Sequence, residues 1–209
     1  RPEMPQDMQT QIPYIHRMVE AFGLRQIRAQ GQEADDLIGT VAAKAAAAGL
    51  DVVIVTGDKD MYQLLSPSVR IFDPVKEKWI GEEECRARFG VGPERVADVM
   101  GLMGDAIDNI PGVKGIGEKT ATKLIKQYGS VEEVLKHAGE LTPKLKGLLT
   151  EHAEAARLSR QLAVIQTDLP LEFQREEFQV KSPPTEPLAG LLRELEFFSL
   201  LKTLQQIGR

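Results

Sequence analysis

Seven carboxylate side chains stand in three short groups of the sequence, and no cysteine or histidine accompanies them. The groups are EADD, TGDKD and GDAIDNIPG, which supply Glu33, Asp35, Asp36, Asp58, Asp60, Asp105 and Asp108. If the fold brings these acids together, they cannot all stay ionised without a cation. Oxygen ligands suit Mg²⁺ or Mn²⁺ and do not suit zinc. Two such ions about 3.5–4 Å apart are the usual apparatus for in-line displacement at phosphate.

Each acidic group taken alone has an ordinary structural explanation. Acids in the first turn of a helix favour its dipole, and this is the better interpretation of EADD by itself. TGDKD follows the apolar run DVVIV, at the end of a strand where α/β sheets bind ligands, but a cap and a turn explain it equally well. Asp105 and Asp108 lie one helical turn apart, in a stretch that also reads as a turn. The argument for a metal site therefore depends on all three groups together.

A glycine-rich loop, GVKGIGEKT at residues 112–120, follows the third acidic group. Glycines let a backbone approach an anion closely, and the start of a helix presents free N–H groups to it. Lys119 and Thr120 can add a charge and a hydroxyl, although the spacing is not that of a P-loop. A helix precedes this loop and another follows it, which is typical of a sequence-independent grip on a nucleic-acid backbone. The alternative is a tight turn between two helices.

The distribution of charge favours the phosphate interpretation of this loop. The 209 residues carry a formal charge of −5, which alone argues against an acidic partner. Between Gly112 and Gly147, however, seven lysines stand against four glutamates. A single cysteine, Cys85, excludes an intrachain disulfide and favours a reducing cytoplasm. No apolar run is long enough to span a bilayer, so no membrane partner is expected.

The elements that must position these groups form an α/β region followed by a mostly helical one. We expect helices over residues 7–22, 33–49 and 61–65, and strands over 24–30, 51–57, 69–74 and 77–81. The run 51–57 reads as a strand buried on both faces of a parallel sheet. The following helices are expected near 82–90, 93–104, 118–129 and 130–139, then one long helix over 142–165. A proline-rich connector at 179–187 leads to a last helical region, broken near Glu196.

These motifs together resemble the 5′-nuclease domain of bacterial DNA polymerase I, in the flap-endonuclease superfamily. The resemblance rests on EADD, TGDKD, MGDAIDNIPGVKGIGEKTA and the EFFSLL region, in that order and over nearly the whole chain. It implies an α/β fold with a partial parallel sheet and flanking helices, then a helical part with a helix-hairpin-helix-type element at 112–120. The α/β metal-site region is expected over residues 1–90 and the helical region over 91–209.

The resemblance also implies roles for residues. All seven acids match metal-site positions for two divalent ions, with Asp35, Asp36, Asp58 and Asp60 at the catalytic centre. The loop is similar to one that grips the duplex and holds a monovalent cation such as K⁺ through backbone carbonyls. The DNA contacts are expected at Arg1, Gly112, Lys114, Gly115, Gly117, Lys119, Thr120 and Lys123. The expected partner is DNA with a 5′ end or a 5′ flap, and the expected location is the bacterial cytoplasm. A polymerase domain can be attached covalently.

The family's first strands, their two aspartates and most of its helical arch do not occur in this sequence. Arg1 looks like the last arginine of that arch. The chain by itself is therefore expected to be a weak or inactive nuclease. Two interpretations stay open from the sequence: a metal-dependent structure-specific 5′ nuclease that acts in DNA replication and repair, and a non-catalytic DNA-binding fragment with an incomplete metal site.

Overall fold

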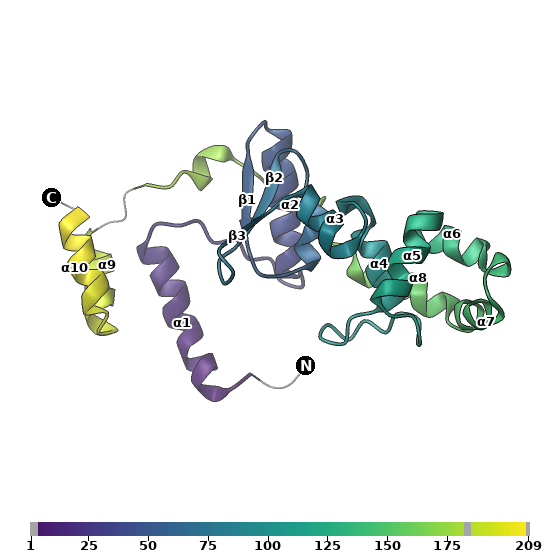
Figure 1. Ribbon diagram of the computed structural model, residues 1–209. Coiled ribbons are helices and arrows are strands. Elements are labelled where there is room, and N and C mark those ends of the chain that lie inside the picture. The colour runs from purple at the N-terminus through teal and green to yellow at the C-terminus, as the bar shows by residue number, and fades with distance from the viewer. Residues whose placement is uncertain (1–3, 182–184, 208–209) are drawn as a thin grey trace. The chain divides into compact units, whose positions relative to one another are not determined.

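The computed structural model describes residues 4–181 and 185–207 of the chain, and Arg1 lies outside them. It divides into two compact units. The smaller unit combines Arg1–Ala29 with Gln174–Arg209, and the larger one is Gln30–Phe173. Figure 1 labels their elements. None of the helices in the described ranges is long and apolar enough to cross a bilayer. The predicted functional division between residues 90 and 91 stays a prediction.

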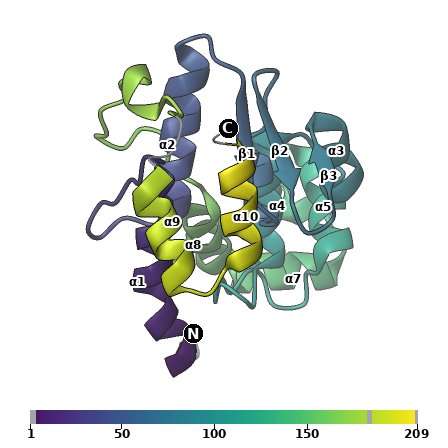
Figure 2. The ribbon, with the colours of Figure 1, turned by 90° about the vertical axis from the view of Figure 1, so that its left-hand side faces the viewer.

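The larger unit contains a three-stranded mixed sheet in the order β1-β2-β3 (Figure 2). β1 (Val52–Val55) runs parallel to β2 (Val69–Asp73), with Ile54 opposite Ile71. β3 (Lys78–Ile80) returns antiparallel to β2, so the two strands predicted at 69–74 and 77–81 form a hairpin. The expectation of a partial parallel sheet is therefore correct for the first pair only, because the short 74–77 turn reverses the chain.

The expectation that β1 is buried on both faces is wrong for the described part of the chain. Ile54 is buried, but the alternate side chains Val53 and Val55 are 42% and 64% exposed. Among the described residues, β1 pairs with β2 alone, and α2 (Ala34–Ala47) contacts it. Successive side chains of a strand point to opposite faces, so covering one face leaves every second valine exposed.

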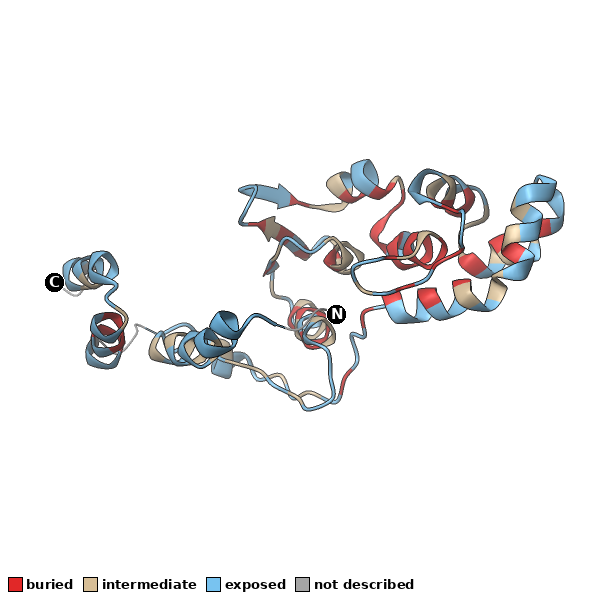
Figure 3. Ribbon diagram, turned by 90° about the horizontal axis from the view of Figure 1, so that it is seen from below, coloured by how far each residue is buried: buried red, intermediate tan, exposed pale blue. Residues whose placement is uncertain are grey.

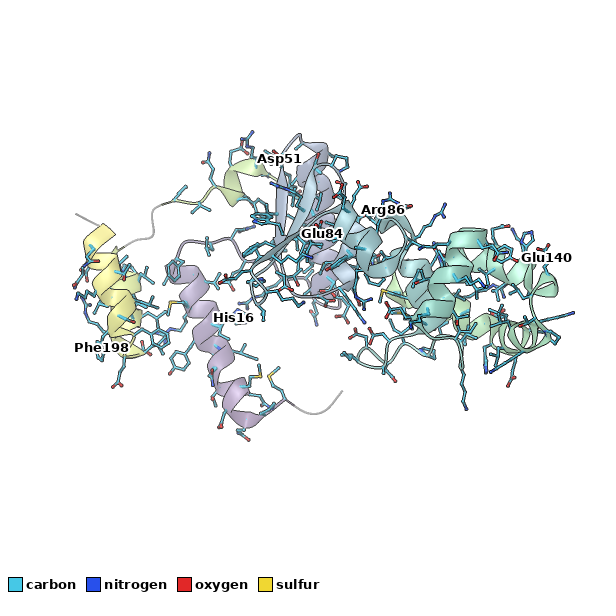
Figure 4. The ribbon with its side chains drawn as sticks, in the orientation of Figure 1. His16, Asp51, Glu84, Arg86, Glu140 and Phe198 are labelled. Carbon is cyan, nitrogen blue, oxygen red and sulfur yellow. The ribbon has the colours of Figure 1, made fainter. Side chains whose placement is uncertain are left out.

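Short helices make up most of the rest of the larger unit. In chain order they are the 3₁₀ helix η1 (Asp60–Leu64), α3 (Glu82–Phe89), η2 (Pro93–Arg95), α4 (Val96–Met103), α5 (Glu118–Tyr128), α6 (Val131–Lys136), η3 (Ala138–Glu140), α7 (Pro143–Glu151) and α8 (Ala153–Ala163). The side chain of Glu84 (Figure 4) accepts the N–H of Gly81 at 2.8 Å and so caps the start of α3. The predicted helix over 142–165 is interrupted, because His152 leaves the helical conformation at φ −111° and ψ 21°.

The core of the larger unit is centred on α4, which is buried along nearly its whole length. Its apolar side chains Val96, Val99, Met100 and Leu102 are fully enclosed, and most of the buried residues in Figure 3 lie in this unit. α4 packs against α8, α5 and η1. A helix that is buried on every side must be covered by other elements. The carbonyl of Leu102 on α4 accepts the N–H of Val113, which ties α4 to the loop that follows it.

The smaller unit contains α1 (Gln6–Ala21), the 3₁₀ helix η4 (Arg175–Phe178), α9 (Thr185–Glu194) and α10 (Phe198–Ile207). Arg17 of α1 donates two hydrogen bonds to Glu194 of α9, at 2.9 and 2.6 Å. The predicted break near Glu196 is confirmed, since this residue adopts a φ of +59° between α9 and α10. Of the predicted connector, residues 182–184 lie outside the described ranges, and α9 already begins at Thr185.

The expected strand at residues 24–30 is absent, and these residues form an irregular segment. The side chain of Gln26 contacts His16 twice, through Oε1 to the ring Nδ1 at 3.0 Å and through Nε2 to the carbonyl oxygen at 3.2 Å. Figure 4 shows His16 on α1. The predicted strand is therefore wrong, and side-chain contacts to α1 hold this segment instead of a strand ladder.

Candidate metal centre

The end of β1 is shaped by side chains that bind the backbone of the next turn. The N–H of Thr56 donates to the carbonyl of Phe72 at 3.0 Å, so pairing with β2 continues one residue beyond the strand. The N–H of Asp58 then donates to Oγ1 of Thr56 at 3.0 Å. The N–H of Asp60 donates to Oδ1 of Asp58 at 2.9 Å. TGDKD is thus both a closed turn and the carrier of Asp60 at the start of η1.

Asp60 has a carboxylate oxygen whose requirements the protein leaves unmet. Its Oδ1 is buried and has no hydrogen-bond partner among the described residues. Burial first, and then the nearby charge of Asp58, raises the pKa of Asp60 to about 6. A buried carboxylate oxygen without a partner is costly, and a cation is the simplest way to satisfy it.

The loop after α4 holds Asp105 rigidly. The N–H of Asp105 donates to the carbonyl of Ile110 at 2.9 Å, and the N–H of Ile110 returns a bond at 2.7 Å. Oδ1 of Asp105 accepts the N–H of Ile107 at 2.8 Å. Asn109, inside this closed loop, takes a φ of +59°. The buried Asp105 side chain therefore has a fixed position, and Asp108 lies in the same loop.

The fold brings three of the predicted ligands into one group. Asp60, Asp105 and Asp108 each offer a carboxylate oxygen, and these oxygens lie within 4.8 Å of one another. The group joins the end of β1 to the loop after α4, which are far apart in sequence. Three oxygen donors at this spacing fit a hard divalent cation. The unpartnered oxygen of Asp60 is an independent sign that this group could hold such a cation.

Lys59 enters the same group, and the sequence interpretation missed it. Its ammonium group forms an ion pair with Oδ2 of Asp105. Burial alone would raise the pKa of Asp105, but the hydrogen bonds from Lys59 and from backbone N–H groups outweigh it, so that pKa lies below its usual value. Burial likewise acts to lower the pKa of Lys59, and the contact with Asp105 raises it overall. A lysine between two acids in TGDKD was the available signal.

The EADD acids have separate surroundings. Asp35 is half-buried, and burial, followed by the charges of Asp58, Glu33, Asp36 and Asp108, raises its pKa. The pKa of Asp35 is therefore affected by an acid from each of the other two groups, Asp58 and Asp108.

Asp36 has a structural contact, because its Oδ1 accepts the N–H of Gln166 at 2.8 Å. Glu33 precedes α2 without forming a side-chain cap and is exposed. Asp58 is also exposed. None of Glu33, Asp35, Asp36 and Asp58 joins the three-acid group in the described part of the chain.

The glycine loop is fixed by two buried side chains and by hydrogen bonds to α4 and α8, and its other side is exposed. Val113 and Ile116 are buried, and the N–H of Val113 donates to the carbonyl of Leu102 on α4 at 2.8 Å. The N–H of Gly112 donates to Oγ of the buried Ser159 on α8 at 2.9 Å. Ser159 is 47 residues away in sequence, and no local pattern could have identified it.

The loop residues predicted to contact DNA differ in exposure. Lys114, Gly115, Gly117, Lys119 and Lys123 are exposed, Thr120 is half-buried and Gly112 is buried. Gly112 and Gly115 have φ values of +61° and +90°, which favour glycine. Gly112 therefore shapes the loop from inside, while the three lysines line its outer side.

Two family models match the chain. The one described as 5′-3′ exonuclease, N-terminal resolvase-like domain, matches residues 1–90, and the one described as 5′-3′ exonuclease, C-terminal SAM fold, matches residues 91–186. The thermostable DNA polymerase I of Thermus filiformis is 42% identical over 209 residues, which are 100% of this chain and 25% of that protein. The chain thus spans about a quarter of the length of that relative.

Solved structures share the fold. A T5 5′-exonuclease with bound zinc ions has a TM-score of 0.67 and 21% identity, with 77% of this chain and 62% of that one covered. The catalytic core of Rad2 with a DNA substrate has a TM-score of 0.61 and 16% identity, with 92% and 64% covered. A 5′-3′ exonuclease of Aquifex aeolicus is 36% identical over 209 residues, 100% of this chain and 71% of that protein. The chain therefore belongs to the 5′-3′ exonuclease family, whose two domain types it contains in sequence order.

Proposed function

We propose that this chain is the nuclease region of a DNA polymerase I-like protein and that it hydrolyses DNA at 5′ ends and 5′ flaps with two divalent ions, Mg²⁺ or Mn²⁺. One observation carries the proposal: the Asp60, Asp105 and Asp108 oxygens lie within 4.8 Å, and Asp60 keeps a buried oxygen without a partner among the described residues. The group lies after a parallel strand, where α/β sheets bind ligands.

Several similar proteins support the substrate and the metal. The Aquifex aeolicus relative is named a 5′-3′ exonuclease, and the T5 5′-exonuclease structure is described as binding divalent metal ions. A T5 flap endonuclease is described in a complex with DNA and metal ions, and the Rad2 core in a complex with a DNA substrate. The relatives named DNA polymerase I support a polymerase as the attached partner.

The acids divide into two sets by position. Asp60, Asp105 and Asp108 hold the first ion in this proposal, and Asp58 and Asp35 provide the nearest negative charge for a second. Asp36 fixes the backbone of Gln166, and Glu33 stays exposed at the start of α2. When bound, paired divalent ions stabilise the attacking and leaving oxygens of a phosphodiester.

The glycine loop is proposed to hold the DNA backbone beside these acids, as a helix-hairpin-helix-type element. Lys114, Lys119 and Lys123 are exposed around the start of α5, where a helix dipole favours phosphate. Contacts of this kind position a duplex without reading its bases. A monovalent cation such as K⁺, held by loop carbonyls, is part of the same proposal.

The test is a cleavage assay on a 5′-flap duplex labelled at the flap, in Mg²⁺, Mn²⁺, Ca²⁺ and EDTA. It uses both the 209-residue chain and the whole source protein. We expect products in Mg²⁺ and Mn²⁺ and none in EDTA, with slower turnover in the chain alone. DNA binding in Ca²⁺ without cleavage by either protein in Mg²⁺ or Mn²⁺ would replace this proposal with the non-catalytic DNA-binding function.

A further inference from the structure

Lys59 places a positive charge inside the acidic group that the proposed function assigns to a metal. We infer that Lys59 is the counter-ion of the metal-free site and that a divalent cation must displace it from Asp105 in order to bind. This inference rests on the proposed function, because it concerns the same three acids. In this inference Lys59 opposes metal binding, whereas the three acids promote it.

The ion pair crosses the site. Lys59 belongs to the turn after β1, and Asp105 belongs to the loop after α4, 46 residues later. The side chain of Asp105 is 4% exposed, whereas that of Lys59 is 34% exposed. The acid is therefore fixed in the interior, and the lysine reaches it from the surface.

Both oxygens of Asp105 already have partners. Oδ1 accepts the N–H of Ile107, and Oδ2 accepts the ammonium group of Lys59. The opposite situation holds at Asp60, whose Oδ1 has no partner among the described residues. A cation that binds Asp60 therefore meets a second acid of the group, Asp105, that is already paired with the ammonium group of Lys59.

Of the partners of Asp105, Lys59 can leave at a lower cost than the backbone N–H groups. The Ile107 N–H belongs to a loop closed by the two hydrogen bonds between Asp105 and Ile110. Lys59 ends a flexible four-carbon stem that already reaches solvent. A divalent ion and an ammonium group on one carboxylate also repel each other. Metal binding and the Lys59–Asp105 pair therefore compete for Asp105.

The chain offers a matched control in Lys76. Its ammonium group pairs with Oδ2 of Asp73 at 2.8 Å, and the Asp73 side chain is 2% exposed. Backbone N–H groups of Val75 and Lys76 bind the other oxygen of Asp73. Here too a lysine pairs with a buried and backbone-fixed aspartate, but Lys76 is a local partner with a side chain 71% exposed, and Asp73 is outside the three-acid group.

The experiment compares Mn²⁺ affinity, by titration calorimetry, with thermal unfolding in EDTA for wild type, Lys59→Met, Lys59→Arg and Lys76→Met. We expect Lys59→Met to unfold at a lower temperature in EDTA and yet to bind Mn²⁺ about threefold to tenfold more tightly, the scale of a partly exposed ion pair with one buried partner. Lys59→Arg keeps the charge and should bind no more tightly than wild type. Lys76→Met should lose stability without any gain in affinity.

The opposite signs separate competition from a structural role. Unchanged or weaker Mn²⁺ binding by a folded Lys59→Met protein would overturn the inference and leave the proposed metal site intact. A wild-type protein that binds no Mn²⁺ would overturn the proposed function as well. Equal gains in Lys59→Met and Lys76→Met would show a general effect of net charge and would also overturn the inference.

Discussion

The segment from Asp105 to Thr120 contains two neighbouring regions that are held in place by different means. In the acidic region, the side chain of Asp105 is fixed by its charge and its acceptor oxygens: it accepts the backbone N–H of Ile107 and pairs with the side chain of Lys59. In the glycine loop, the backbone is fixed by small residues and by contacts from below. A Cβ added to Gly112 would lie 2.3 Å from the backbone nitrogen of Gly104.

The difference shows what each region needs for its proposed task. A metal site depends on charges at fixed positions. We therefore expect that changing one of these charges leaves the backbone in place. An anchor for phosphate needs a close approach, so its shape depends on the absence of side chains. Substitutions that change charge should therefore affect the acidic region through binding, and substitutions that add volume should affect the loop through folding.

The largest expected effect is on the loop. Gly112→Val should lower the free energy of unfolding by about 3 kcal/mol or more, because the new side chain meets fixed backbone at a φ of +61°. Urea denaturation measures this change. Gly117→Val is the control, since no atom lies within 4 Å of a Cβ there and its φ is −92°.

Gly117→Val should change stability by no more than about 1 kcal/mol, the scale of losing a glycine cap. It should weaken DNA binding in Ca²⁺, because the exposed backbone can no longer approach a phosphate. Equal loss of stability in both variants would show that the whole loop is a structural turn.

The next effect concerns the acidic region. Asp60→Asn should weaken Mn²⁺ binding by at least about tenfold, since even residues that support metal ligands cost this much when changed. The metal-free protein should fold at least as well as wild type, because a raised pKa shows that the ionised carboxylate is disfavoured. Calorimetry and thermal unfolding in EDTA check the two halves. Wild-type Mn²⁺ affinity in this variant would remove Asp60 from the site.

The same carboxyl group predicts a pH dependence of the metal-free protein. The pKa of Asp60 is about 6 in the folded chain and 3.8 at its ordinary value. Folding therefore favours the protonated form, so this stabilisation is complete below about pH 4 and is lost as pH rises through 6. The contribution is about 1–2 kcal/mol after a discount for partial exposure.

Unfolding by urea in EDTA at several pH values measures this dependence, with Asp60→Asn as the reference. The difference between the two proteins should change between pH 4 and 7 and level off on either side. A constant difference across that range would contradict the assignment.

The smallest effect sharpens the proposed role of the loop. Lys119→Ala should leave stability within about 0.5 kcal/mol, as an exposed substitution does. It should lower the slope of log affinity against log salt by roughly 0.9, the contribution of one neutralised duplex phosphate. Binding to two unrelated duplexes in Ca²⁺ should weaken equally. An unchanged slope would assign the phosphate contact to other residues.

The predictable parts of the site are those encoded within a few residues. Asp105 and Asp108 lie together because one loop carries both, and Asp60 ends the short turn that follows β1. The contacts that complete the site join distant segments: Lys59 with Asp105, Gly112 with Ser159, and Asp36 with Gln166. No periodicity reports such pairs, because each depends on how helices pack.

The errors in the predicted fold have the same origin. β-branched residues predicted β1 correctly, but burial on a second face requires a covering element that the strand's own sequence does not specify. The segment 24–30 had a strand-like pattern, and the side-chain contacts of Gln26 with His16 took precedence. The residue pattern of one segment thus predicts the conformation of that segment better than it predicts which other elements pack against it.

The end of α8 and the irregular segment 164–169 that follows it are bound by side chains from two earlier elements. Gln63 on η1 bonds the carbonyl of Ala163 and the N–H of Ile165, each at 2.9 Å. On α2, Asp36 binds the N–H of Gln166 at 2.8 Å, and Thr40 binds that of Leu169 at 3.3 Å.

A ribosome makes α2 and η1 long before it makes these partners. The acids of the centre are therefore translated early, and their supporting elements gain their last contacts only when the segment around residue 166 has emerged. A nascent chain that stalls before this point carries every ligand of the three-acid group but not its completed frame. Competence to hold a metal should therefore appear late in synthesis, once both the segment around residue 166 and Ser159, the partner of the Gly112 N–H, have emerged.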